Sequence, residues 1–122
     1  MIWHRGRTDT RFVASLDSAG SEVFLGKGRC GECHPSPYYT DGSMHNLRTE
    51  RFFNPRMING RMANSDGPIK TFPLRGIKDS PPYLHDGRLL TLEDTVEFFN
   101  VVTELKLTEQ EKKDLVAFMR CL

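Results

Sequence analysis

The chain has 122 residues, enough for one compact domain, and 17 Lys+Arg against 16 Asp+Glu give a formal net charge of +1. This balance argues against nucleic acid, a membrane surface or a polyanion as partner, and no apolar run is long enough for a membrane span. Only 38% of the residues are hydrophobic, while ten Gly and seven Pro indicate a loop-rich chain. A domain this polar needs a further source of stability, and a large buried cofactor would be one.

The beginning of the chain shows little periodicity. Residues 1–17 are expected to form an irregular extension, in which Trp3 and Phe12 are isolated apolar anchors. No apolar stretch of the secretory-signal type is present there, so we expect the chain to be a mature form or a piece of a longer protein. The domain itself is expected over residues 18–122. It opens with a short helix over 18–25, where the apolar side chains fall on one side.

Two of the three cysteines form a tight pair that is followed by a histidine. Cys30, Cys33 and His34 make a C-x-x-C-H motif, which is the signature of c-type haem attachment. Two thiols three positions apart can add to the two vinyl groups on one edge of a porphyrin, and the next residue then lies under the iron as the proximal ligand. Chance would produce the motif roughly 0.002 times in a chain of this composition. The sequence therefore predicts one covalently bound haem c with His34 on its iron.

A zinc site, a redox dithiol and a disulfide are the alternatives for this cysteine pair. Structural zinc needs a second close pair of ligands, whereas Cys121 stands alone and His45 and His85 are too scattered in the sequence to complete a site. A redox dithiol is typical of a βαβ pattern, which is not visible here, and three cysteines are a poor disulfide framework. Because haem attachment of this kind occurs outside the reducing cytoplasm, we expect a periplasmic or equivalent compartment.

The middle of the chain, residues 35–73, is dominated by turn signals such as Asn59-Gly60. A loop of this length in a small domain is functional or wraps around something, and a porphyrin edge fits that description. No segment predicts a strand with confidence.

Helical patterns return in the last third of the chain. Thr91 and Thr108 each stand three positions before an acidic residue, as in a capping box, and each precedes an apolar periodic run. These patterns predict helices over 92–101 and 108–122, the second of them amphipathic. The expected architecture is all-α, with three to five helices around one haem and long loops closing the pocket.

Several motifs in a fixed order run through residues 18–122. They are GKGRCGECHP (26–35), YTDG (39–42), HNL (45–47), FPLRGI (72–77), PYLHDG (82–87), TLEDTVEFFN (91–100), LTE (107–109) and DLVAF (114–118). In order and spacing the chain resembles the C-terminal haem domain of the bacterial di-haem cytochrome c peroxidases and of the methylamine-utilisation di-haem enzymes. The resemblance implies the cytochrome c fold, and it implies electron handling, since peroxide chemistry in that family belongs to the other haem.

The sequence departs from this family at two points. It holds one C-x-x-C-H motif where the family has two haem domains in one chain. The family also places its distal ligand, Met or Tyr, twelve residues after the Gly of the His-Asp-Gly motif. Counting from Gly87 gives Phe99, which has no lone pair to offer iron.

The distal side of the iron therefore stays open among three possibilities. One is an open or water-filled site. Another is a methionine from the long loop, where Met44, Met57 and Met62 are the candidates; the third is His85 or a group from a neighbouring chain. A thioether would raise the reduction potential, a second imidazole would lower it, and an open site would bind small ligands.

Arg75 lies in the Leu-Arg-Gly segment that the family keeps beside the haem, so the resemblance makes it a candidate partner for a propionate; an ordinary surface arginine is the alternative. Three function classes follow. The first is a c-type cytochrome that carries single electrons between redox partner proteins, which could include another haem domain or subunit. The others are a haem enzyme, or enzyme domain, of the cytochrome c peroxidase type and a small-ligand-binding haem protein. Calcium binding, which such di-haem relatives show between their domains, is not predicted here.

Overall fold

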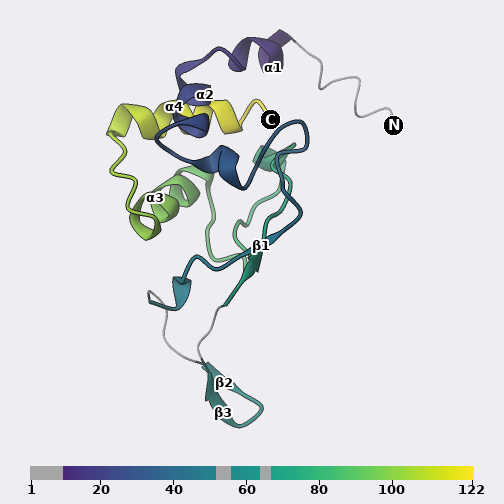
Figure 1. Cartoon of the computed structure of the whole chain (residues 1–122), viewed down its shortest axis with the longest axis vertical. Helices are drawn as coiled ribbons and strands as arrows, with labels where there is room; N and C mark the ends of the chain where they lie inside the picture. Colours follow the sequence, from purple (N-terminus) through teal and green to yellow (C-terminus); the bar gives the residue numbers. More distant parts are fainter. Residues whose placement is uncertain (1–9, 52–55, 64–66) are drawn as a thin grey trace.

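A computed structural model of the chain describes residues 10–51, 56–63 and 67–122. Within these ranges the helices are α1 (Thr10–Ser15), α2 (Ala19–Leu25), α3 (Leu92–Val102) and α4 (Glu109–Met119), and short 3-10 turns include η2 (Cys30–Glu32). The helices gather at one end of the molecule, while the segment between η2 and α3 forms loops and short strands beside them (Figure 1). The regular secondary structure of the described part is thus mainly helical, with little sheet, which is compatible with the all-α, cytochrome-like fold predicted from the sequence.

Side-chain caps start the three predicted helices. Ser18 accepts a hydrogen bond from the Ser21 amide at the start of α2, and Thr91 accepts one from the Asp94 amide at the start of α3. Thr108 makes a complete capping box with Glu111 at the start of α4. Each cap satisfies a helix N–H that would otherwise lack a partner. The predicted helices are confirmed, with α4 ending three residues earlier than expected.

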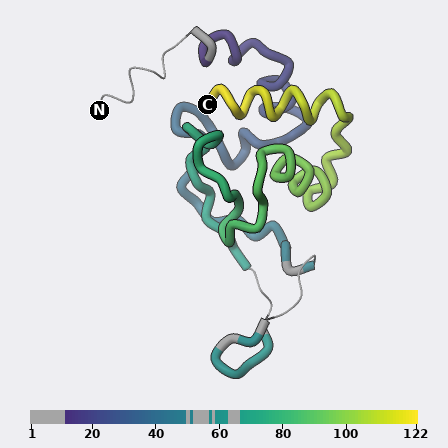
Figure 2. The backbone as a smooth tube through the Cα atoms, turned by 180° about the vertical axis from the view of Figure 1, so that it is seen from behind, coloured from purple at the N-terminus to yellow at the C-terminus, as the bar shows by residue number. Residues whose placement is uncertain are grey.

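The core is built where α2 crosses α4, two helices far apart in the sequence that run side by side in both views (Figures 1 and 2). Gly20 permits this crossing, because a Cβ at this position would lie 2.1 Å from the Asp114 carbonyl oxygen. The rings of Phe24 and Phe118 then meet at 5.2 Å between centroids. The ring of Tyr39 joins them from the loop after η2.

Helix α1 lies inside the segment that was expected to be irregular, so that expectation is wrong for residues 10–15, while residues 1–9 fall outside the described part. Six residues are too few to show helical periodicity in a sequence. The segment is fixed by a contact distant in sequence, because the guanidinium carbon of Arg75 lies 4.3 Å from the Phe12 ring centroid. The division of the chain at residue 17 stays a prediction.

Within the described residues, four short strands form two antiparallel pairs. β1 (Met44–His45) pairs with β4 (Ile69–Lys70), and β2 (Arg56–Ile58) pairs with β3 (Arg61–Ala63). The sequence did not indicate these strands, because strands of two or three residues are too short to show alternation. The predicted Asn59-Gly60 turn closes the second pair, with φ values of 50° and 78° as a two-residue hairpin turn requires.

Candidate functional site

The cysteine motif follows directly on the end of α2. The Gly28 amide donates to the Val23 carbonyl at 2.7 Å, and a Cβ on Gly28 would lie 2.8 Å from the same oxygen. Arg29 then takes a left-handed conformation with φ of 55° and starts the single turn η2. The two glycines of 26–28 thus end the helix and turn the chain so that the motif begins beside the core.

Cys30 and Cys33 are both free thiols and stand at the two ends of this turn. Residues three apart on a 3-10 turn project to the same side, so both sulfurs can reach one edge of a shared ligand. Burial raises the pKa of Cys30 to about 12 and, as the largest cause, also raises the pKa of Cys33. Burial therefore favours the neutral thiol form of both side chains.

His34 is held by the loop that follows the motif. Its Nδ1 lies 2.7 Å from the carbonyl oxygen of Tyr39. Because a carbonyl can only accept, Nδ1 carries the proton and Nε2 keeps the lone pair that a metal needs. Burial is the largest influence on the His34 pKa and lowers it, which favours this neutral form. In metal-bound histidines, the ring nitrogen that does not bind the metal usually donates a hydrogen bond to a group such as a backbone carbonyl.

The acceptor for the His34 ring is the carbonyl of Tyr39, five residues further along the chain. The Tyr39 amide donates to the Pro35 carbonyl at 2.8 Å, so the chain folds back and brings the Tyr39 carbonyl over His34. The same carbonyl accepts from the Leu74 amide at 3.2 Å. The Tyr39 side chain is only 4% exposed, so the aromatic core fixes the group that orients the imidazole.

Arg75 carries a buried nitrogen, Nη1, that has no hydrogen-bond partner among the described residues. Its guanidinium instead lies over two aromatic rings, 4.3 Å from Phe12 and 6.0 Å from Tyr39. Leaving a buried donor unpaired costs about 1–3 kcal/mol, and more when the group is charged. Arg75 is therefore partly buried, and an acidic group of a ligand would satisfy its Nη1. Its role as a propionate partner stays a prediction.

Apolar side chains near the motif are left uncovered. Leu25 is 70% exposed, and its Cδ2 would lie 2.9 Å from a Cβ on Gly31 between the two cysteines. Phe72 is 56% exposed, and its backbone lies close enough to His34 to raise the pKa of the imidazole against the effect of burial. Two thiols on one side, a neutral imidazole, an arginine nitrogen that lacks a hydrogen-bond partner and exposed apolar side chains together fit an apolar, acidic, iron-containing group such as haem.

The candidate distal ligands lie on three different segments: the β2–β3 hairpin, β1 and the loop before α3. Met57 and Met62 lie opposite each other across the β2–β3 hairpin, with 63% and 65% exposure. The hairpin lies well away from the helices (Figure 1). Met44 is also exposed, on β1, and His85 is exposed in the loop before α3. Phe99 is half-buried on α3. The identity of the distal ligand stays a prediction.

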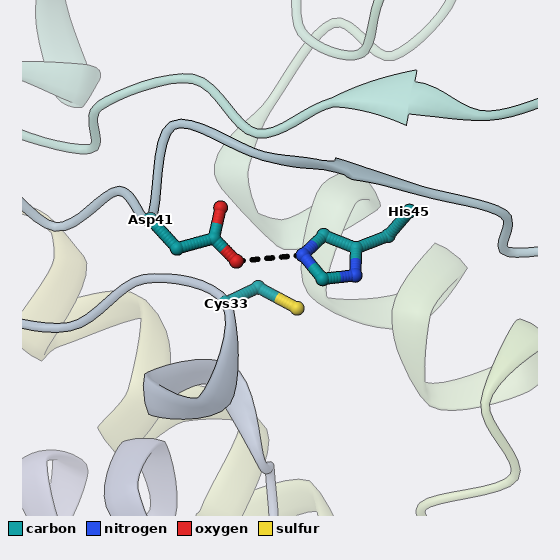
Figure 3. A group of neighbouring side chains, drawn as sticks. All are labelled: Cys33, Asp41 and His45. Carbon is teal, nitrogen blue, oxygen red and sulfur yellow. Dashed lines mark hydrogen bonds and ion pairs between the residues drawn. The ribbon is translucent and has the colours of Figure 1, made fainter.

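One cluster is not apparent from the sequence, where the spacing led us to judge His45 too scattered to join the cysteine pair. Cys33, Asp41 and His45 each offer a ligand atom, and these atoms lie within 4.8 Å of one another (Figure 3). That judgement is wrong for His45, because the loop after the motif folds back and brings β1 to Cys33. The Asp41 amide donates to the Cys33 carbonyl at 2.9 Å, a contact that no spacing rule indicates.

No family model matches the chain. Among curated proteins it is 32% identical to cytochrome-c peroxidase IdrP2 of Denitromonas iodatirespirans over 93% of this chain, and 30% identical to methylamine utilization protein MauG of Methylorubrum extorquens over the same share. It is also 36% identical to cytochrome-c peroxidase IdrP1 of Denitromonas iodatirespirans over 67% of this chain. The chain spans 41%, 36% and 24% of the lengths of these three relatives. Over most of its length it is thus a homologue of part of the cytochrome-c peroxidase IdrP and MauG proteins, as its sequence motifs predicted.

Proposed function

We propose that the chain is a c-type haem domain that carries single electrons between redox partners. Cys30 and Cys33 would hold one haem covalently, and His34 would be the proximal ligand of its iron. The observation that carries the proposal is the juxtaposition of two thiols on one side of η2 with a neutral imidazole that is fixed through Nδ1. When bound, the haem supplies one-electron chemistry at its iron.

The residues of the chain have defined tasks in this proposal. The Tyr39 carbonyl holds the His34 ring in one tautomer and one orientation, so little rearrangement is needed when the charge on the iron changes. Arg75 offers its unpaired Nη1 to a propionate. Because Arg75 is permanently charged, it also favours the more negative, reduced state of the site.

A second function, peroxide reduction, is favoured by the names of the relatives, two of which are cytochrome-c peroxidases. Such an enzyme needs an open iron and an acid–base group within hydrogen-bond reach of the bound oxygens. The described residues offer one hydrogen-bonded acid–base pair near the motif, Asp41 with His45, at 2.6 Å. That pair lies against Cys33, on the side of the proposed thioether bonds.

We also propose a periplasmic or equivalent location, since thioether attachment of haem belongs to compartments outside the reducing cytoplasm. In the described part of the chain, no helix is long and apolar enough to cross a membrane. The partner is proposed to be a redox protein, which could be another haem domain or subunit. This proposal rests on the relatives, of which the chain matches only 41% and 36% of the length.

The experiment compares electron exchange with peroxide turnover on the haem-loaded chain. Stopped-flow mixing with a reduced cytochrome, without peroxide, should show fast one-electron exchange. Steady-state oxidation of the same cytochrome by hydrogen peroxide should run no faster than with free haem. Robust peroxide turnover would overturn the carrier and establish the enzyme. In that case H45A should lower turnover by about 10²-fold or more, if the Asp41–His45 pair moves the proton.

A further inference from the structure

We propose that Cys33, Asp41 and His45 form a binding site for a thiophilic divalent cation such as Zn²⁺ in the chain before haem is attached, and that a cation held there blocks haem attachment at Cys33. The metal site stands on the geometry of the three side chains. The competition with haem rests in addition on the proposed function.

The three donor atoms converge from three points of the chain. Figure 3 shows the Asp41 carboxylate and the His45 ring facing each other, with the Cys33 sulfur beside them. Asp41 Oδ2 lies 2.6 Å from His45 Nε2, and all three ligand atoms lie within 4.8 Å of one another. A tetrahedral zinc ion separates its ligand atoms by about 3.3 Å for nitrogen and oxygen and about 3.6 Å when sulfur is one of the pair. The cation can therefore enter between the donors with small side-chain shifts.

Backbone contacts hold the donors in place. The Asp41 amide donates to the Cys33 carbonyl at 2.9 Å, which ties the two ligand-bearing residues together. The Ser43 amide donates to Asp41 Oδ1 at 2.8 Å, so that Oδ2 is the oxygen turned toward His45. His45 sits on β1, opposite Ile69 of β4. Because these positions are set by the fold, the site requires little ordering when a cation binds.

The donor set selects the kind of cation. One thiolate, one imidazole and one carboxylate are ligands that Zn²⁺ accepts, and three protein ligands leave a fourth position for water. Calcium requires six to eight oxygen ligands, which this cluster does not offer. The Asp41 and Glu32 carboxylates add negative potential at Cys33, and the Arg29 guanidinium opposes them. That potential attracts a cation, and binding then releases the thiol proton to solvent.

Haem and the cation need the same sulfur. In haem attachment the Cys33 S–H adds across a vinyl C=C bond, so that an S–C bond and a C–H bond form and no external oxidant or reductant is consumed. The resulting thioether has no charge to offer, whereas zinc binds the thiolate. A bound cation and a thioether at Cys33 therefore exclude each other.

The test uses the haem-free full chain and Co²⁺ as a spectroscopic probe, with Zn²⁺ displacing it in a competition titration. Wild type should show thiolate-to-cobalt absorption, and D41N and H45A should each bind at least about tenfold more weakly. H85A, which changes a histidine outside the cluster, should bind like wild type. C30S should also bind like wild type, because Cys30 is not a ligand of this site.

Two results would overturn the metal site. One is no thiolate absorption in wild type. The other is loss of binding in C30S with full binding in H45A, which would assign the metal to the C-x-x-C-H motif itself. A second measurement tests the competition: zinc should slow thioether formation in wild type and have little effect in H45A, and equal inhibition of both would refute it. Failure of haem attachment without any metal would refute the proposed function and leave the metal result standing.

Discussion

Replacing Gly20 by alanine tests the crossing of α2 and α4, on which the geometry around His34 depends. A Cβ at this position would lie 2.1 Å from the Asp114 carbonyl oxygen and 2.7 Å from Phe118 Cβ. Ordinary contacts begin at 3.4 Å, so the first of these falls short by 1.3 Å. The obstacle is helix backbone, which cannot rotate away as a flexible side chain can. The two helices must therefore separate.

The expected cost follows from two opposing effects. Overpacking of this kind costs about 3 kcal/mol, the upper part of its usual range, because a main-chain atom is involved. Alanine is favoured over glycine inside a helix by about 1 kcal/mol. The net loss in the free energy of unfolding is therefore about 2 kcal/mol. Separation of the helices also pulls apart Phe24, Phe118 and Tyr39, so the His34 support should loosen.

The assay is guanidinium unfolding of the haem-loaded chain, followed by helix circular dichroism and by the haem absorption band. Gly67→Ala is the matched control, since nothing lies within 4 Å of a Cβ there and no left-handed φ is required. It should change the free energy of unfolding by less than about 0.5 kcal/mol. A Gly20→Ala chain as stable as the control would refute the close helix crossing.

Three further predictions concern the site. Phe99→Met should convert the haem-loaded chain to a low-spin spectrum with a sulfur-to-iron band if the family's distal position is vacant here; an unchanged spectrum would contradict that placement. Arg75→Met should lower the reduction potential of the haem-loaded chain, and it should lower the free energy of unfolding by about 1.5–3 kcal/mol. The control variant Arg120→Met, at an exposed arginine, should lower the free energy of unfolding by less than about 1 kcal/mol. Equal effects of the two variants would exclude Arg75 as a propionate partner. Hydrogen bonding to His45 holds the pKa of Asp41 below its ordinary 3.8. The contribution of this pair to the free energy of unfolding is therefore complete above pH 3.8 and is lost as the pH falls through the lowered pKa. Below about pH 4, the free energy of unfolding should therefore fall more steeply with decreasing pH in wild type than in Asp41→Asn. Parallel curves would show that the Asp41–His45 pair does not contribute to stability.

The helices and the attachment motif could be read from the sequence because their signals are local. Thr91 and Thr108 mark helix starts through side chain–backbone bonds that span three residues. The C-x-x-C-H motif places its three functional groups within five consecutive positions. Short-range rules of this kind need no knowledge of tertiary structure.

The rest of the site depends on how the loop after the motif folds back, which no local rule gives. The Tyr39 carbonyl reaches His34 because the Tyr39 ring is buried between α2 and α4. His45 reaches Cys33 because β1 pairs with β4, some twenty-five residues later in the chain. Both contacts are consequences of long-range packing. The same holds for the position of α1, where Phe12 lies against the Arg75 guanidinium.

Intact mass of the purified chain under denaturing, acidified conditions tests the central claim most directly. If Cys30 and Cys33 carry thioether bonds, the mass should exceed that of the 122-residue polypeptide by one haem, and a Cys30→Ser, Cys33→Ser chain should show the polypeptide mass alone. A wild-type chain that gives only the polypeptide mass while its haem passes into organic solvent would contradict the account.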